Sequence, residues 1–166
     1  MKEIFERRSI RKYTKKDIAS NSIEKLLRAA MAAPSAGNQQ PWEFVIIKDK
    51  NMLIDITKIH PHSQMLINAS LAITVCADLS KEKYGSYWIQ DCSAATENIL
   101  IEAQYLGLGA VWLGVYPFED RVEGIKKLLN LPTRIVPFSI VSLGYPDEKK
   151  DSVDRYDELK IHINKW

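Results

Sequence analysis

Three arginines and a serine lie within five residues near the start of the chain, and together they suit a phosphate group. The segment reads Arg7-Arg8-Ser9-Ile10-Arg11. A guanidinium pairs bidentately with phosphate oxygens, and a serine hydroxyl or a nearby amide can fill a third oxygen. The same spacing is also typical of a solvated basic edge of a helix, because short basic clusters are common on surfaces. Both interpretations stay open on this segment alone.

A second segment combines small residues with side-chain amides. It reads Ala33-Pro34-Ser35-Ala36-Gly37-Asn38-Gln39-Gln40-Pro41-Trp42 and lies between a predicted helix and a predicted strand. Small residues let the backbone approach a ligand closely. Asn38 and the two glutamines offer donors and acceptors for an amide-rich ring. The composition also suits an ordinary helix-to-strand loop, so this segment too has a purely structural interpretation.

A third segment, Gly107–Pro117, contains a Gly-x-Gly pattern that precedes a predicted strand instead of following one. The glycines of a dinucleotide-binding fingerprint must open a helix onto the pyrophosphate, so a Rossmann site is excluded here. Gly114, near the end of the predicted strand, instead indicates a backbone that another group approaches edge-on.

No group of residues provides acid, base, nucleophile or metal chemistry. His60, His62 and His162 have no acid and nucleophile nearby in the pattern, and Pro61 between polar residues predicts an exposed loop at 60–62. Asp91 and Glu97 are six residues apart and lie off a common helical face. Two cysteines and three scattered histidines form no metal template, and the cysteines are read as small buried hydrophobes. An enzyme of this composition would take its chemistry from an organic cofactor.

Composition and charge narrow the class of protein. The chain has 166 residues, 46% of them hydrophobic and 27% charged, which is typical of one globular domain. Its net charge is +2, but residues 1–16 carry +5, so the rest carries −3. This distribution argues against broad nucleic-acid binding and for one local anionic partner. No apolar run reaches the ~18 residues that a membrane span needs, and no signal peptide is recognised, so a cytoplasmic protein is expected.

Hydrophobic periodicity predicts an α+β domain over residues 1–166. The predicted helices are Lys2–Arg8, Ser22–Ala33 with Ser22 as its cap, Asn51–Ile59, Tyr87–Leu106 and Glu119–Leu129. The predicted strands are Phe44–Ile47, Leu71–Cys76, Ala110–Val115 and Ile135–Leu143. Small residues at 92–95 of the longest helix would admit another backbone or a flat ligand. The charged tail, 147–166, has few core residues and is expected to fray or to dock on another subunit.

Taken in order, the segments 7–13, 33–42 and 107–117 resemble the nitroreductase family of FMN-dependent oxidoreductases, and the helix around 90–99 is similar in style. The resemblance covers about residues 2–146. It implies a mainly antiparallel central sheet wrapped by helices, in an intertwined homodimer with two FMN molecules at the subunit interface. At 166 residues the chain has little room for the helical excursion that covers the flavin in longer members, so a shortened lid and an open pocket are expected.

The resemblance also implies roles for individual residues. Arg7, Arg8, Ser9 and Arg11 would hold the FMN phosphate and ribityl end. Pro34, Ser35, Ala36 and Asn38 would line the isoalloxazine from the partner subunit. Leu113 and Gly114 would lie against the ring near N5. Family members place a basic residue after the last strand at the phosphate, and Arg155 is the best match in this tail. No side chain is assigned as catalytic and no metal is expected.

The activity implied is FMN-dependent oxidation of NADH or NADPH. A ping-pong hydride mechanism would reduce small electron-poor acceptors such as nitroaromatics or quinones, with one stacking site serving both substrates in turn. Two alternatives share the binding residues. One is an FMN-binding protein for storage, sensing or regulation without turnover, and the other is a related flavin enzyme such as a dehalogenase. Neither a nucleic-acid nor a membrane partner is expected.

Overall fold

A four-stranded antiparallel sheet organises the chain, and strand β2 at its centre is buried along its whole length. The computed structural model describes residues 2–166. The strands are β1 (Trp42–Ile47), β2 (Leu71–Asp78), β3 (Gly109–Gly114) and β4 (Ile135–Gly144), in the order β1-β2-β4-β3. β2 reads Leu-Ala-Ile-Thr-Val-Cys-Ala-Asp, an almost continuous apolar run, because helices cover both of its faces.

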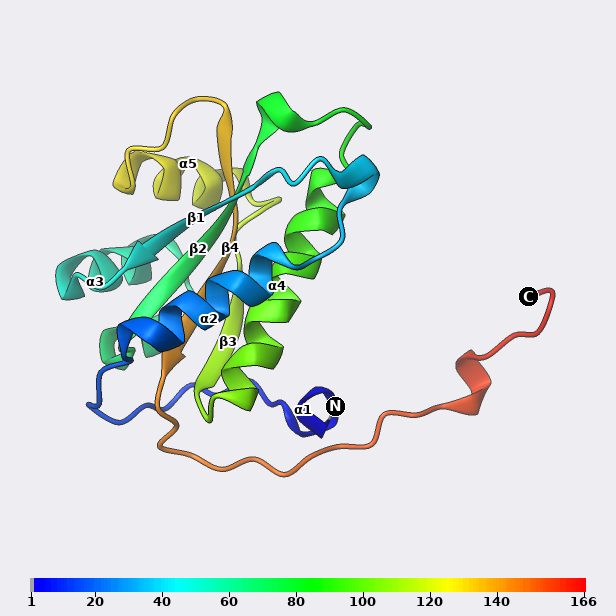
Figure 1. The fold of residues 1–166 in the computed structure, drawn as a ribbon. Helices are drawn as coiled ribbons and strands as arrows, with labels where there is room; N and C mark the ends of the chain where they lie inside the picture. The colour runs from blue at the N-terminus through cyan, green and yellow to red at the C-terminus, as the bar shows by residue number, and fades with distance from the viewer. Residues whose placement is uncertain (1) are drawn as a thin grey trace.

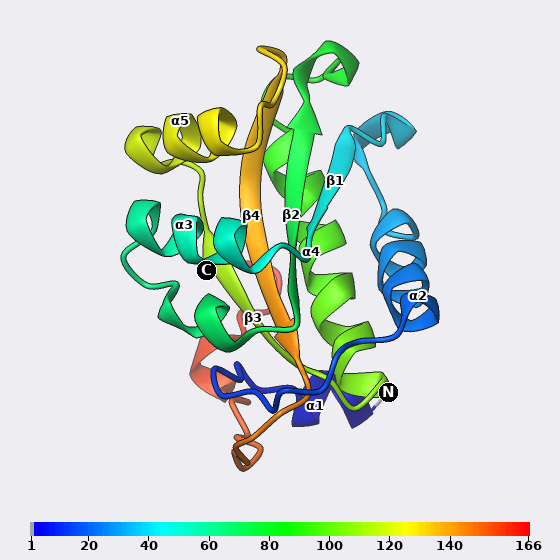
Figure 2. The ribbon, with the colours of Figure 1, turned by 90° about the vertical axis from the view of Figure 1, so that its left-hand side faces the viewer.

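Helices pack on the two faces of the sheet and form a three-layer arrangement, with α3 and α5 on one side and α2 and α4 on the other (Figures 1 and 2). The helices are α1 (Lys2–Glu6), α2 (Ser20–Met31), α3 (Lys50–Ile59), α4 (Trp88–Tyr105) and α5 (Glu119–Leu128). Leu26, Ala95 and Ile99 belong to the core on one face of the sheet. Leu53, Ile56 and Ile125 belong to the core on the other. The α+β class and the antiparallel sheet predicted from the sequence are confirmed.

All four predicted strands and all five predicted helices are present, with shifts of one to a few residues at their ends. The predicted cap of α2 is wrong. The helix begins at Ser20, and Ala19 precedes it without any side-chain cap. The amide of Ile18 is held by the Ser70 hydroxyl at 2.9 Å, and the Ile18 side chain is buried. The chain therefore turns into the helix directly after this anchor, which places Ser22 inside the first turn.

Proline lies within β4 at a bulge. The pairing of β2 with β4 shifts between Val75 and Cys76, where Pro137 replaces the expected partner. Proline cannot donate to the ladder, and a bulge is where a sheet tolerates it. The bulge leaves the Phe138 carbonyl free to accept the amides of Val115 at 3.1 Å and Tyr116 at 3.0 Å. These bonds fix the segment that leaves the end of β3.

Residues 9–14 are joined by β-bridges and hydrogen bonds to the start of β3 and to the residues that follow β4. Ser9 bridges to Ala110 and Tyr13 bridges to Pro146. The Tyr13 hydroxyl donates to the Ile10 carbonyl at 2.8 Å, and its ring lies over Gly144 where a Cβ would be only 2.7 Å from the ring. This packing places the arginine cluster beside the chain that follows β4.

Residues 147–166 leave the body of the protein in an extended course with one short turn at Glu158–Lys160 (Figure 1). Their apolar side chains are exposed, for example Leu159 at 87% and Ile163 at 82%. No helix within residues 2–166 combines the length and the apolar character that crossing a bilayer requires.

Candidate functional site

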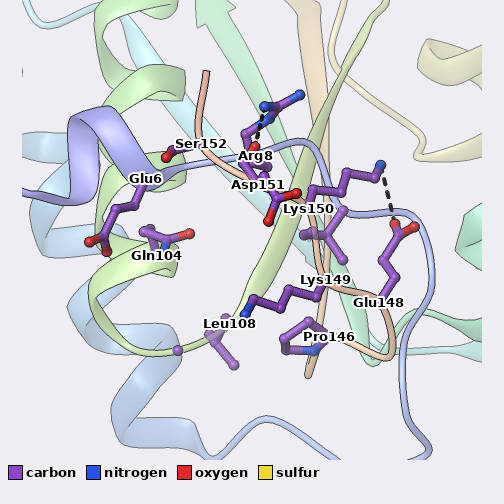
Figure 3. A pocket seen from close by; sticks show the side chains of 12 residues that line it. Glu6, Arg8, Gln104, Leu108, Pro146, Glu148, Lys149, Lys150, Asp151 and Ser152 are labelled. Carbon is purple, nitrogen blue, oxygen red and sulfur yellow. Dashed lines mark hydrogen bonds and ion pairs between the residues drawn. The ribbon is translucent and has the colours of Figure 1, made fainter. Parts of the chain in front are cut away.

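A cavity of about 410 Å³ opens where the arginine cluster meets the chain after β4 (Figure 3). Its wall combines α1 and the segment behind it, the end of α4, the turn before β3 and the first residues of the tail. The lining residues are Glu6, Arg8, Ile10, Gln104, Gly107, Leu108, Pro146, Glu148, Lys149, Lys150, Asp151 and Ser152. We call this the Arg8 cavity.

The polar groups of the Arg8 cavity are only partly paired. Arg8 donates through Nη1 to the Asp151 carbonyl oxygen. Lys150 Nζ donates to the Ser9 carbonyl at 2.7 Å and lies 3.4 Å from Glu148 Oε1. Lys149 has no hydrogen bond or ion pair within residues 2–166, and Figure 3 shows it extended past Leu108, away from Lys150. Lys149 and the remaining N–H groups of Arg8 are therefore available to an anion.

Glu148 is bound to the backbone of the arginine cluster, so it is not a free negative charge in the cavity. Its Oε1 accepts the amides of Arg11 at 2.6 Å and Lys12 at 3.2 Å. The hydrogen bond from the Arg11 amide, helped by Lys150, holds the pKa of Glu148 below its usual range. The carboxylate is thus committed to positioning this segment.

The other four predicted phosphate contacts are not among the residues that line the Arg8 cavity. Arg7 Nε lies 3.4 Å from Glu97 of α4, and no hydrogen-bond acceptor for this buried nitrogen is found in residues 2–166. Ser9 is half-buried and occupies a β-bridge, and Arg11 is exposed. Arg155 lies farther along the tail, beside a separate cavity lined by Phe5 and Tyr156.

The small-residue loop lies at the opposite end of the sheet, before β1. Pro34 and Asn38 are exposed, and Ser35 and Ala36 are half-buried. The amide of Ala36 donates to Asp91 Oδ1 at 2.9 Å, which attaches the loop to the first turn of α4. The four residues predicted to line the isoalloxazine therefore form one surface loop, distant from the Arg8 cavity.

Leu113 and Gly114 end β3, also at this far end of the sheet. Leu113 is buried and Gly114 is half-buried. A Cβ added at Gly114 would meet nothing within 4 Å among residues 2–166, and its φ is not positive. Packing within this chain therefore does not require a glycine at this position, and the space beside the end of β3 is open.

Two donors meet at the Gly114 carbonyl, and sequence reasoning missed both. His60 Nε2 lies 2.9 Å from this oxygen and Arg121 Nη1 also lies 2.9 Å from it. A carbonyl only accepts, so Nε2 carries the proton, while Nδ1 accepts the His62 amide at 3.2 Å. His60 is 2% exposed, so the prediction of an exposed loop is wrong for this residue, although His62 is exposed. Burial lowers the pKa of His60.

Strand geometry separates the three predicted segments within one chain. β3 runs from Gly109, beside the Arg8 cavity, to Gly114, a span of roughly 17 Å at the usual rise per residue. The 34–38 loop precedes β1 at the opposite edge of the sheet from β3, roughly 14 Å away across three strand spacings. A ligand that touches both ends of β3 must therefore be elongated.

The profile of the nitroreductase family matches residues 4–72 and 60–145 of this chain. The chain belongs to the nitroreductase family. A relative from Archaeoglobus fulgidus, provisionally named an NADH dehydrogenase/NAD(P)H nitroreductase, is 52% identical over 100% of this chain and 98% of its own.

Solved nitroreductase-fold structures superpose closely on this chain. A provisionally named NADH oxidase from Clostridium acetobutylicum has a TM-score of 0.96 at 48% identity and covers 99% of both chains. An FMN-dependent nitroreductase from Clostridium difficile has a TM-score of 0.92 at 33% identity, covering 99% of this chain and 98% of that one. The family resemblance inferred from three short segments is thereby confirmed.

Several residues of interest in this nitroreductase-family chain carry no signal in the sequence. Lys149 belongs to a charged tail, in which the sequence predicts a solvent-exposed lysine. It lines the cavity because the first residues of the tail pass beside Arg8. Asp91 and Gln39 are far apart in sequence, yet both are buried and hydrogen-bonded to each other at 2.7 Å.

No cluster of metal-ligating side chains occurs in the part of the chain that the structure describes.

Proposed function

We propose that this protein is an FMN-dependent oxidoreductase that takes reducing equivalents from NADH or NADPH. The observation that carries the proposal is the Arg8 cavity, in which Arg8 and Lys149 present unpaired donors beside the strand that leads to Gly114. Family membership and the FMN-dependent relative from C. difficile support the choice of flavin over other phosphate ligands.

The residues present fit FMN in chemistry and in layout. The free Lys149 and the remaining N–H groups of Arg8 suit an added dianionic group. A phosphate carries roughly −1.5 to −2 charge near neutral pH, which the local excess of cations at the N-terminus matches. FMN is also elongated, with its ring carried on a ribityl phosphate, as the separation along β3 requires.

In this proposal each segment has one task. Arg8 and Lys149 bind the phosphate, with Arg7, Ser9 and Arg11 around it. Leu113 and Gly114 receive the ring at the open end of β3. Arg155 remains a proposed contributor from the tail, although it lies beside a different cavity in this chain.

The loop holding Pro34, Ser35, Ala36 and Asn38 is proposed to serve the flavin of a second copy. Within one chain this loop and Gly114 stand at opposite edges of the sheet. We propose a homodimer in which the exposed tail, 147–166, docks on the partner and the loop of one copy lies at β3 of the other. The exposed apolar side chains of the tail, such as Leu159 and Ile163, supply the surface for that contact.

Bound FMN supplies reversible hydride chemistry between a nicotinamide and an electron-poor acceptor, for which nitroaromatics and quinones are the proposed classes. The chain itself offers positioning and electrostatics. The cations of the Arg8 cavity hold the anionic end, and the unobstructed Gly114 leaves room for a flat ring. His60 and Arg121 hold the Gly114 carbonyl, so the strand end keeps its position whether or not a ring is present.

The test compares FMN with riboflavin, which lacks the phosphate. Arg8→Ala should weaken FMN binding about tenfold or more, since a charge-assisted hydrogen bond contributes about 1.5–3 kcal/mol. Riboflavin binding should change much less. Arg28→Ala is the matched control, because Arg28 pairs with Glu24 on α2, away from the cavity. Equal losses for both ligands would remove Arg8 from the phosphate site.

Steady-state oxidation of NADH or NADPH with a nitroaromatic or quinone then tests turnover. A protein that releases FMN on denaturation but oxidises neither nicotinamide would belong to the storage or regulatory alternative. A colourless protein that cannot be reconstituted with FMN would refute the proposal.

A further inference from the structure

The loop from Ser35 to Gln40 has an unusual backbone. Gly37, Asn38 and Gln40 have φ values of 51°, 55° and 48°, all in the left-handed region. Glycine and asparagine adopt this region readily, but a glutamine does so only when its surroundings impose it. Hydrogen bonds within the loop hold part of this shape, since Ser35 Oγ accepts the Gln40 amide at 3.0 Å and Asn38 Oδ1 accepts Gln40 Nε2 at 3.1 Å. Contacts with the rest of the chain hold the remainder.

Asp91 provides the first of those contacts. Its side chain comes from the first turn of α4 and is only 4% exposed. Oδ1 accepts the Ala36 amide at 2.9 Å, and Oδ2 accepts Gln39 Nε2 at 2.7 Å. No basic side chain pairs with this carboxylate within residues 2–166. The hydrogen bonds that offset the cost of burying this carboxylate therefore come from the loop, which couples the position of the loop to Asp91.

Gln39 extends the contact to the connection between β2 and α4. While Nε2 donates to Asp91, Oε1 accepts the Lys83 amide at 3.0 Å. Beside it, the Tyr84 ring lies so close to Gly37 that a Cβ there would be 2.2 Å from the hydroxyl oxygen. The loop is thus hydrogen-bonded to Asp91 and lies against the Tyr84 ring.

We propose that Asp91 is a positioning residue that fixes the 35–40 loop, through the Ala36 amide and Gln39, in the shape that receives the flavin ring. The inference rests on the proposed function, in which this loop lines the isoalloxazine. A loop already fixed in its binding shape loses less conformational entropy when the ligand arrives. Asp91 would therefore raise affinity for the ring without touching it.

The proposal can be tested by exchanging the acid at position 91 and the amide at position 39, because each of these hydrogen bonds has a fixed donor and acceptor. In Asp91→Asn, the side chain keeps one acceptor for Ala36 but turns an NH₂ toward the NH₂ of Gln39. If Gln39 rotates to repair this, it turns an NH₂ toward the Lys83 amide instead. One bond of the chain is lost either way.

The double variant Asp91→Asn with Gln39→Glu restores every bond with the same shapes and the same net charge. The new side-chain amide at position 91 would accept from Ala36 and donate to position 39. The new carboxylate at position 39 would accept from that amide and from the Lys83 backbone N–H. Glu102→Gln is the matched control, since it makes the same acid-to-amide change on α4 at a half-buried side chain that has no hydrogen bond or ion pair within residues 2–166.

The experiment measures FMN and riboflavin affinity, together with hydrogen exchange of the Ala36 and Lys83 amides in flavin-free protein. Asp91→Asn should weaken FMN and riboflavin by the same factor, about tenfold or more, because the ring and not the phosphate is affected. It should also speed exchange of both amides. The double variant should recover most of the affinity and of the protection, and Glu102→Gln should change neither.

Two results would overturn the inference. One is an Asp91→Asn protein that binds riboflavin as tightly as the wild type. The other is a double variant that melts like the wild type but binds riboflavin no better than Asp91→Asn. A wild-type protein with protected Ala36 and Lys83 amides that binds neither flavin would instead refute the proposed function.

Discussion

Gly114→Ala separates two explanations of the glycine at the end of β3. If the glycine is needed by the fold, a side chain there should clash within the chain. If it leaves space for the flavin ring, the flavin-free protein should tolerate a side chain. The structure favours the second explanation, because a Cβ at Gly114 meets nothing within 4 Å among residues 2–166.

The magnitude follows from a comparison with Gly144, which lies on the neighbouring strand β4. A Cβ at Gly144 would be 2.7 Å from the Tyr13 ring, so Gly144→Ala should cost about 1–3 kcal/mol through overpacking. For a chain of this size that corresponds to roughly 2–4 °C in Tm per kcal/mol. Gly114→Ala should leave the stability of the flavin-free protein unchanged or raise it by about 0.4–1 kcal/mol, since alanine restricts the unfolded chain.

The assay is a thermal melt of flavin-free protein beside a fluorescence titration with FMN. Gly114→Ala should keep its Tm and bind FMN about tenfold or more weakly. Gly144→Ala should lose Tm but bind riboflavin, which makes no use of the phosphate site, normally in its folded fraction. A Gly114→Ala protein that melts as low as Gly144→Ala while keeping its FMN affinity would refute the reasoning.

Three other features make predictions. Because burial lowers the pKa of His60, the unfolded chain binds its proton more readily, so stability should fall as pH drops below about 6.5. Urea unfolding of His60→Gln, which keeps an NH₂ donor, should show a shallower fall, and an unchanged profile would contradict this. Burial raises the pKa of the Cys76 thiol to about 12 and also raises the pKa of the Cys92 thiol. Because only the thiolate reacts readily, iodoacetamide should label neither cysteine before unfolding, and mass spectrometry checks this. The FMN-loaded protein should sediment as a homodimer; a stable 19.0 kDa species carrying FMN would contradict the proposed interface.

The regular elements were predictable because each leaves a local periodic pattern. In α2, for example, Ile23, Leu26 and Ala30 are buried, and their spacing of three and four residues can be recognised within the segment itself. The apolar run of β2 is equally local. Where prediction failed at the start of α2, a distant residue decided the outcome, since Ser70 anchors the chain just before the helix.

The candidate site was predictable only in outline. The arginine cluster and the 33–42 loop are visible as segments, and family resemblance joins them. The groups that hold these segments in place are single residues from elsewhere in the chain. His60 is buried with its Nε2 2.9 Å from the Gly114 carbonyl, and Asp91 is buried with its Oδ1 2.9 Å from the Ala36 amide. Neither distance can be read from spacing along the sequence.

The bridges and hydrogen bonds that join residues 9–14 to β3 and to the end of β4 determine when, during protein synthesis, the Arg8 cavity can form. The bridge partners of Ser9 and Tyr13 are Ala110 and Pro146, and the Lys12 carbonyl accepts the Asp147 amide at 2.9 Å. At ribosomal rates of ~5–20 residues per second, roughly 7–30 s separate the synthesis of the first partners from that of the last. Until the end of this interval the basic segment lacks the partners of Tyr13 and Lys12. Capture of a phosphate ligand must therefore follow translation of the final strand, and a chain cut short before residue 146 would leave the ribosome unable to form the Arg8 cavity.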